Sequence, residues 1–456
     1  MTRRAHRSSH MTARTRVFAS LSVPNYRRYA AGALVSNTGT WMQRVAQDWL
    51  VLTELTGHSA VAVGITTGLQ LSPALVLAPY AGVLADRLPR QRLMMLTQAA
   101  GATFAFVLGG LVVTGLAQLW MVYLLALALG VSTALEGPAR QTFVSELVPR
   151  ELMSNAVGLN SASFNAGRLL GPGLAGLGIA AVGTGLVFIL NGLSFMVSLV
   201  ALASLRRDRL FPMPRARRAR GQIADGIRYV RTRPDLMVVM ATAAVVGAFA
   251  LNLQLTTALM ATQVYHKGPG EYGLLGSITA VGSLGGALLA ARRQRPTLRL
   301  FVLATLAFGA SLGAAAVMPT YVLFAISLVP CGLSALTLMT VANATVQLNT
   351  DDPMRGRVMA LYIAVFMGGT PIGSPMIGWV GDTFGARWAL GVAALTCLIV
   401  GILAAAVLSH MRGVSLLAAG IALLRRQPLP AREGVDADAA LCERPTGAAR
   451  FSAGKH

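Results

Sequence analysis

Residues 60–116 read AVAVGITTGLQLSPALVLAPYAGVLADRLPRQRLMMLTQAAGATFAFVLGGLVVTGL, two long apolar runs that flank a short loop rich in arginine. Each run is long enough to cross a bilayer as a helix, which takes about 20 mostly apolar residues. The pattern recurs along the whole chain of 456 residues, of which 54% are hydrophobic and 12% are charged. The sequence therefore predicts an all-α membrane protein, because a bilayer solvates apolar surface that a water-soluble fold could not bury.

Twelve such runs are predicted to span the membrane, six in each half of the chain. They cover residues 29–52, 60–84, 92–116, 119–142, 156–181, 183–205, 236–262, 271–291, 298–318, 320–346, 357–381 and 388–410. The predicted organisation is an N-terminal tail (1–28), an N-terminal half (29–205), a basic linker (206–235), a C-terminal half (236–410) and a C-terminal tail (411–456). At an offset of 202, Gly171 matches Gly373 and Gly183 matches Gly385, so the halves resemble each other weakly. Two related halves around a central site are one transporter architecture.

The arginines lie almost entirely in every second gap between the runs. The loops that contain them include Arg87–Arg92, Arg206–Arg233 and Arg292–Arg299. Positive residues in short loops stay in the cytoplasm, so both termini are predicted to be cytoplasmic in a bacterial inner membrane. The net charge of +22 then follows from this bias and favours anionic lipid. A nucleic-acid partner is not expected, because the arginines are spread over separate short loops without a soluble domain.

The loop between the second and third runs carries a recognisable motif, Gly82-Val-Leu-Ala-Asp86-Arg87-Leu-Pro-Arg90-Gln-Arg92. Gly82 lets a neighbouring helix approach closely, and Asp86 can face the positive end of a helix. The motif resembles the loop 2–3 signature of the major facilitator superfamily, G-x-L-A-D-R-x-x-R-x-R, with Pro89 where a glycine is usual. That resemblance implies a gate that latches the two halves on the cytoplasmic side. The residues assigned to this gate are Gly82, Asp86, Arg87, Arg90, Arg140 and Arg357.

The fifth run contains a second motif, Gly167-Arg-Leu-Leu-Gly171-Pro172-Gly-Leu-Ala175-Gly176. Small residues at this spacing form a smooth face for close helix packing, and proline bends a helix. The motif resembles the antiporter signature of the same superfamily, G-x-x-x-G-P-x-x-G-G, with Ala175 in place of one glycine, and this implies export; plain helix packing is the alternative. Segments 36–43, 136–141 and 355–359 are similar to the bacterial branch that includes the enterobactin exporter and drug exporters.

Ionisable side chains inside the runs are costly in lipid and are therefore candidates for function. In the first run, Arg44 and Asp48 lie four residues apart and share a helix face, with Gln43 and Gln47 beside them. Such a pair forms either a proton site or an ion pair near the outer end of the helix. A proton carrier needs a carboxylate whose pKa is raised by burial and lowered by a neighbouring cation. Asp48 is therefore the first candidate.

Two interpretations, a structural role and a role in the transport pathway, remain for the other polar residues inside the runs. Glu136 and Arg140 form either a structural latch or part of a substrate site, and Arg168 either ties its helix to an acid elsewhere or lines the pathway. Amides in other positions either hold helices together or contribute to the same pathway; they are Asn165, Asn252 and Gln254.

Together these features predict export of a small molecule, such as a drug, natural product or siderophore, by a monomer that uses proton entry. No G-x-x-x-x-G-K-[ST] segment is present, so ATP is not expected to power this chain. An importer is the alternative within the same class, and a non-transporting receptor or a membrane enzyme is the alternative from another class. No catalytic set, metal-ligand spacing or cofactor motif favours an enzyme, and no cofactor or metal is expected.

Overall fold

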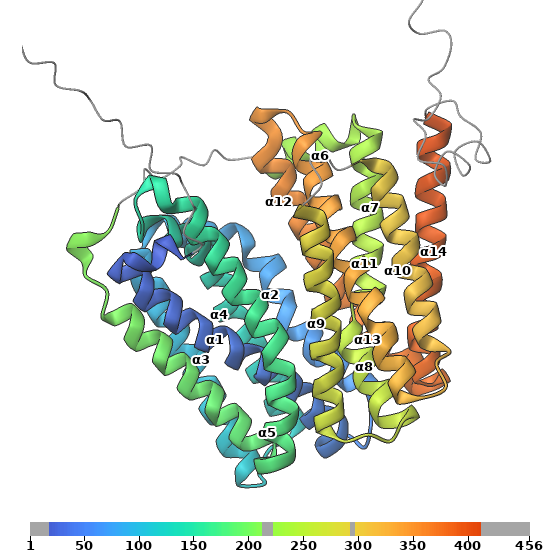
Figure 1. Cartoon of the computed structure of the whole chain (residues 1–456), viewed down its shortest axis with the longest axis horizontal. Helices are drawn as coiled ribbons and strands as arrows, with labels where there is room; N and C mark the ends of the chain where they lie inside the picture. The colour runs from blue at the N-terminus through green and yellow to red at the C-terminus, as the bar shows by residue number, and fades with distance from the viewer. Residues whose placement is uncertain (1–17, 212–221, 292–296, 412–456) are drawn as a thin grey trace, which may run out of the picture.

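The computed structural model describes residues 18–211, 222–291 and 297–411, and these ranges are almost entirely helical (Figure 1). Ten helical segments within them are long and apolar enough to cross a membrane. One segment, residues 150–203, contains two crossings, because Gly183 interrupts its helix with φ of 82°. The first helix is more polar than the ten segments and adds a further crossing. The protein is thus an all-α membrane protein with twelve crossings.

The helices fall into two groups along the chain. The N-terminal half contains α1 (Pro24–Trp49), α2 (Ala60–Arg87), α3 (Arg90–Val113), α4 (Leu119–Glu146) and α5 (Met153–Ala203). The C-terminal half contains α7 (Pro234–Phe249), α8 (Leu253–Leu259), α9 (Pro269–Ala291), α10 (Leu298–Ala316), α11 (Tyr321–Leu348), α12 (Asp352–Gly368), α13 (Thr370–Phe384) and α14 (Ala386–Met411). Between them, α6 (Gln222–Arg231) lies against α12 (Figure 1).

Short helical segments of other types complete the fold. Three 3₁₀ turns cover Ala19–Ser22, Arg150–Leu152 and Arg207–Arg209, and two π segments, Leu50–Leu55 and Met260–Val264, extend α1 and α8. Helix starts use local caps: the side chains of Ser59, Thr297 and Thr320 accept hydrogen bonds from backbone N–H groups in the first turns of α2, α10 and α11.

Two glycines turn the chain at equivalent places in the two halves. Gly183 and Gly385 adopt φ of 82° and 96°, which a side chain would disfavour, and they lie 202 residues apart. Before Gly183, α5 runs parallel to α1, since Tyr26 bonds to Ala156 and Asn37 bonds to Ser163. After Gly183 it returns antiparallel, which brings later residues of α5 beside earlier residues of α1. The turn therefore separates the fifth and sixth crossings where the sequence predicts.

The predicted spans at 236–262 and 357–381 are present, but the helix of each is interrupted. The first is interrupted between α7 and α8, where Asn252 turns its side-chain Nδ2 back to the Ala248 carbonyl at 2.6 Å. The second is interrupted at Gly369, between α12 and α13. Pro371 lacks an N–H group for the helix ladder, and a Cβ at Gly369 would lie 2.7 Å from the carbonyl oxygen of Ala244. At the first break a side-chain amide bonds to the backbone, and at the second a neighbouring helix lies too close for a side chain.

The two halves contact each other mainly at the end of the molecule opposite α6. There α5 packs against α9, and α2 packs against α13. A Cβ at Gly64 of α2 would lie 2.5 Å from the carbonyl oxygen of Ser374 in α13. Toward the end that carries α6, the ribbons of the two halves diverge (Figure 1). The backbones of the two halves are therefore closest at the end opposite α6.

Candidate functional site

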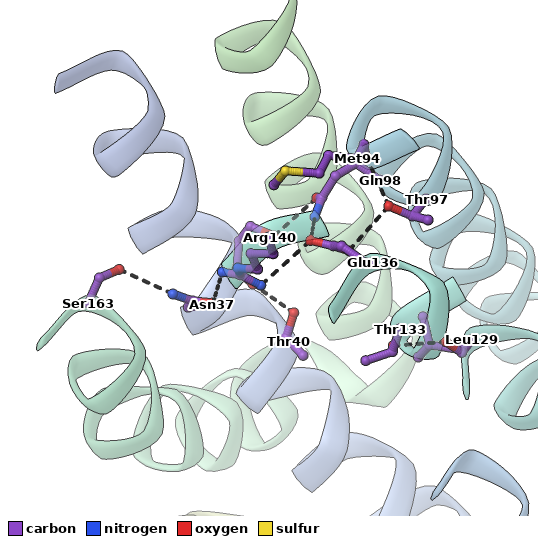
Figure 2. A network of polar contacts seen from close by, with 11 residues as sticks. Asn37, Thr40, Met94, Thr97, Gln98, Leu129, Thr133, Glu136, Arg140 and Ser163 are labelled. Atoms are coloured by element: carbon purple, nitrogen blue, oxygen red, sulfur yellow. Dashed lines mark hydrogen bonds and ion pairs between the residues drawn. The ribbon is translucent and has the colours of Figure 1, made fainter. Parts of the chain in front are cut away.

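A network of polar side chains surrounds Glu136 inside the N-terminal half, and Figure 2 shows it. Gln98 Nε2 donates to Glu136 Oε1 at 3.0 Å, and Thr97 Oγ1 donates to Glu136 Oε2 at 3.3 Å. Arg140 Nη1 forms an ion pair with Glu136 Oε1 at 3.7 Å, and its Nη2 donates to Asn37 Oδ1 at 2.6 Å. The Glu136–Arg140 pair thus links α1, α3 and α4 within the N-terminal half.

A cavity of about 80 Å³ lies beside this network. Its wall includes Thr40 and Arg44 of α1, Gln70 of α2 and Ser132 of α4. The space suffices for several water molecules, and the polar groups around it can hydrogen-bond to them. A polar cavity that could hold water therefore lies between Glu136 and Arg44 inside the N-terminal half.

Asp48 forms the second polar cluster, at the contact between the halves. The side chain is 6% exposed, and its Oδ2 accepts a hydrogen bond from Tyr272 Oη of α9 at 3.3 Å. The side-chain amide of Gln254 in α8 also interacts with this carboxylate. Trp49 stacks on the Tyr272 ring with centroids 6.1 Å apart. An acid of the N-terminal half is thus held by polar groups of the C-terminal half.

Arg44 and Arg168 lie on the same aromatic ring, that of Trp41. The guanidinium carbons are 4.9 Å and 5.8 Å from the ring centroid. Arg168 comes from α5, and its Nη2 donates to Ser283 Oγ of α9 at 3.4 Å. Among the residues that the structure describes, no carboxylate oxygen lies within 4.0 Å of either guanidinium. A direct ion pair between Arg44 and Asp48, one of the two alternatives left by the sequence, is therefore not formed in this conformation.

Several predicted pathway amides have partners other than Asp48. Asn165 Nδ2 donates to the carbonyl of Ser161 in its own helix, as Asn252 does to Ala248. Gln43 Oε1 accepts from Asn191 in the sixth crossing, and Gln47 is 3% exposed. Of the predicted amides, Gln254 is the one that the structure brings to Asp48.

The glycine motif of α5 packs against two helices. Gly167 and Gly171 face α1, and a Cβ at Gly171 would lie 2.5 Å from that of Trp41. Pro172 and Gly176 face α9, and a Cβ at Gly176 would lie 2.5 Å from the carbonyl oxygen of Pro269. Small residues at this spacing allow the two backbones to approach. The motif therefore forms part of the contact between the halves and places Arg168 at its edge.

The predicted gate is described only in part. The side-chain surroundings of Gly82 and Asp86 lie outside the described residues, and Arg87 is exposed. Arg90 pairs with Glu146 and connects the start of α3 to the end of α4. Arg357 of α12 pairs with Asp225 of α6 at 3.1 Å. Arg90 and Arg357 thus hold elements within their own part of the chain, and Arg140 belongs to the Glu136 network.

Asp382 and Tyr272 form polar contacts between the halves, and the sequence did not predict a role for either residue. Asp382 of α13 accepts hydrogen bonds from the backbone N–H groups of Ala60 and Val61 at 2.6 Å and 3.0 Å, and from Ser59 Oγ at 3.1 Å. This carboxylate therefore caps the start of α2 from the other half. Asp382 lies one residue beyond a predicted span, so the sequence could have indicated an acid at a helix end. It could not have indicated the partner, which lies more than 300 residues away.

Twelve crossings in two related halves, with charged residues at their contact, define a transporter of the major facilitator superfamily. The chain belongs to the transmembrane secretion effector family of this superfamily, whose model matches residues 15–439. It is therefore a multi-pass membrane transporter, and the family resemblance expected from the two motifs is confirmed.

Relatives of similar length are known in several bacteria. The chain is 26% identical to the MFS-type transporter YfiS of Bacillus subtilis over 77% of its own length and 86% of that protein. It is 23% identical to the staphyloferrin A transporter of Staphylococcus aureus, with 76% and 87% covered. It is 27% identical to the enterobactin exporter EntS of Shigella flexneri, with 78% and 85% covered.

Solved structures share the fold. A bacterial homologue of the human lysosomal transporter Spinster, in an inward-facing and unoccupied conformation, matches with a TM-score of 0.70 and 14% identity, covering 90% of this chain and 99% of that chain. The nucleoside transporter NupG matches with a TM-score of 0.67 and 10% identity, covering 84% and 98%. At these identities the likeness concerns the fold alone.

Proposed function

We propose that this chain exports a small molecule from the bacterial cytoplasm by alternating access, driven by proton entry. The observation that supports this proposal is Asp48, a buried acid at the contact of the two halves that bonds across it to Tyr272. Two relatives are named for siderophores, enterobactin and staphyloferrin A, so a drug, a natural product or a siderophore is the proposed class of substrate. A membership in a transporter family argues against a receptor or an enzyme.

Protonation of Asp48 would change how strongly the halves hold each other. A carboxylate accepts a stronger hydrogen bond than a neutral carboxylic acid does. The ionised acid therefore favours the packing in which Tyr272 Oη lies 3.3 Å from its oxygen, and the protonated acid weakens it. A group whose charge state favours one packing over another is what coupling requires.

The arginine distribution supports a protein in the bacterial inner membrane whose two termini both lie in the cytoplasm. In that orientation α6 lies on the cytoplasmic side, the halves diverge toward the cytoplasm, and the conformation is inward-facing. Protons and the small molecule are the proposed partners, together with anionic lipid at the basic loops. We propose a monomer that works without nucleic acid, with residues 29–205 and 236–410 as its two moving halves.

Transport into proteoliposomes tests the proposal. Vesicles with an acidic interior should accumulate at least one of ethidium, 2,3-dihydroxybenzoate and citrate from outside, because protons leaving the vesicle drive uptake by an exporter. Asp48→Asn should abolish this accumulation and retain exchange down a gradient. Asp208→Asn, which alters an exposed acid outside the crossings, is the matched control.

Three results are decisive against parts of the proposal. Accumulation that requires acid outside the vesicles identifies an importer. Wild-type accumulation by Asp48→Asn removes Asp48 as the proton carrier, and Glu136 becomes the next candidate. Uptake that is unaffected when the pH gradient is dissipated removes proton coupling.

A further inference from the structure

Two arginines share one tryptophan at the contact between the halves. Arg44 of α1 and Arg168 of α5 both lie over the Trp41 ring, 4.9 Å and 5.8 Å from its centroid. An aromatic face attracts a cation, but it does not neutralise the charge. The tryptophan therefore positions the two guanidiniums and leaves most of their hydrogen-bonding capacity for other groups.

Neither arginine has a carboxylate partner among the described residues. Arg44 Nε is buried without a hydrogen-bond partner there, and Arg168 has a long bond of 3.4 Å to Ser283. The nearby acids are otherwise engaged: Glu136 is bound by Gln98, Thr97 and Arg140 (Figure 2), and Asp48 is bound by Tyr272. A partly buried cation inside the membrane without a counter-ion is costly, which makes a mobile anion the simplest partner.

The surroundings of the pair suit a ligand that moves through the protein. Arg44 lines the polar cavity of about 80 Å³ in the N-terminal half. Arg168 reaches α9 of the C-terminal half through Ser283. Relative motion of the halves would therefore change the environment of Arg168, and with it the strength of binding.

We propose that Arg44 and Arg168 form a subsite for an anionic group of the transported molecule, such as a carboxylate or a phenolate. The planar guanidinium donates two parallel hydrogen bonds to such a group, which gives direction as well as attraction. Trp41 is the positioning residue for both arginines. This inference rests on the proposed transport function and narrows its substrate class to small organic anions.

Equilibrium binding tests the subsite without a proton gradient. The full-length protein in nanodiscs of phosphatidylcholine is titrated with citrate, 2,3-dihydroxybenzoate and salicylate as anions, and with ethidium as the cation. At least one anion should bind saturably, and Arg44→Gln and Arg168→Gln should each weaken it at least tenfold, the loss expected for a charged hydrogen bond. Lysine at either position should retain part of the affinity. Arg28→Gln, an exposed arginine on α1, should bind like the wild type.

A charge reversal keeps the test decisive if a glutamine variant unfolds. Arg168→Glu, checked for folding by thermal unfolding, should lose the anion and gain affinity for ethidium. The inference is overturned if no anion binds, if ethidium binds the wild type in preference, or if the anion binds the arginine variants as tightly as the wild type. The subsite and the proton coupling can fail separately: saturable anion binding that requires both arginines, together with wild-type accumulation that is unaffected when the pH gradient is dissipated, contradicts the transport mechanism and leaves the subsite standing.

Discussion

Removal of the Asp382 carboxylate should shift the protein away from the conformation described here. Asp382 holds the start of α2 through Ser59, Ala60 and Val61 and is a polar link between the halves at the end opposite α6. Opening of that end separates α13 from α2 and must break all three hydrogen bonds. The link therefore stabilises the present conformation relative to the one open at the other end.

The size of the shift follows from the kind of contact. An acid at a helix start contributes about 0.3–1 kcal/mol at an exposed site, and loss of a capping side chain costs about 0.5–2 kcal/mol. Asp382 is exposed, so we expect about 1 kcal/mol for Asp382→Ala. A change of this size alters the ratio of the two conformations roughly fivefold.

Distance measurements between the halves can detect this change. Spin labels at Leu116 and Val317, which are exposed in loops at the end opposite α6, report its opening by double electron–electron resonance. The three native cysteines are replaced by serine in this background. Asp382→Ala should move population from the shorter to the longer distance, and Asp208→Asn should not. An identical distance distribution in Asp382→Ala and wild type would refute the view that this carboxylate holds the halves together.

Four further outcomes are expected. Glu136→Gln removes the counter-ion of Arg140 and should cost the N-terminal half about 1–3 kcal/mol, measured as a lower Tm in detergent; an unchanged Tm contradicts this. Arg357→Gln breaks a half-exposed ion pair with Asp225 and should lower the free energy of unfolding by less than about 1 kcal/mol. A decrease in Tm of more than about 4 °C would mean that the pair stabilises the protein more than a surface ion pair does. Asp86→Asn should slow transport at unchanged equilibrium binding; lost binding with intact cycling would show that the residue is misplaced. Reporter fusions after Arg92 and at the C-terminus should both indicate cytoplasm, and an external signal at either would overturn the orientation.

The number of crossings and their division into two halves were readable from the chain alone. Hydrophobicity over about 20 residues is a local property, and it marks a crossing wherever the helix later packs. The same holds for the two crossings that meet at Gly183, because the apolar stretch from 156 to 205 is about twice the length that one crossing needs. The glycine motif of α5 likewise predicted a packing face before its partners were known.

The polar contacts depended on the tertiary structure. Asp48 and Arg44 share a helix face, yet Asp48 bonds to Tyr272, 224 residues away, and Arg44 turns to Trp41 and the cavity. Helix spacing determines which side chains can meet within one helix, but a buried polar group takes the partner that its neighbouring helices supply. The break at Gly369 also depends on packing, because the carbonyl oxygen of Ala244 in α7 lies where a side chain at this position would begin. Local sequence thus determined the membrane helices, and packing between distant segments decided which of their polar residues form the site.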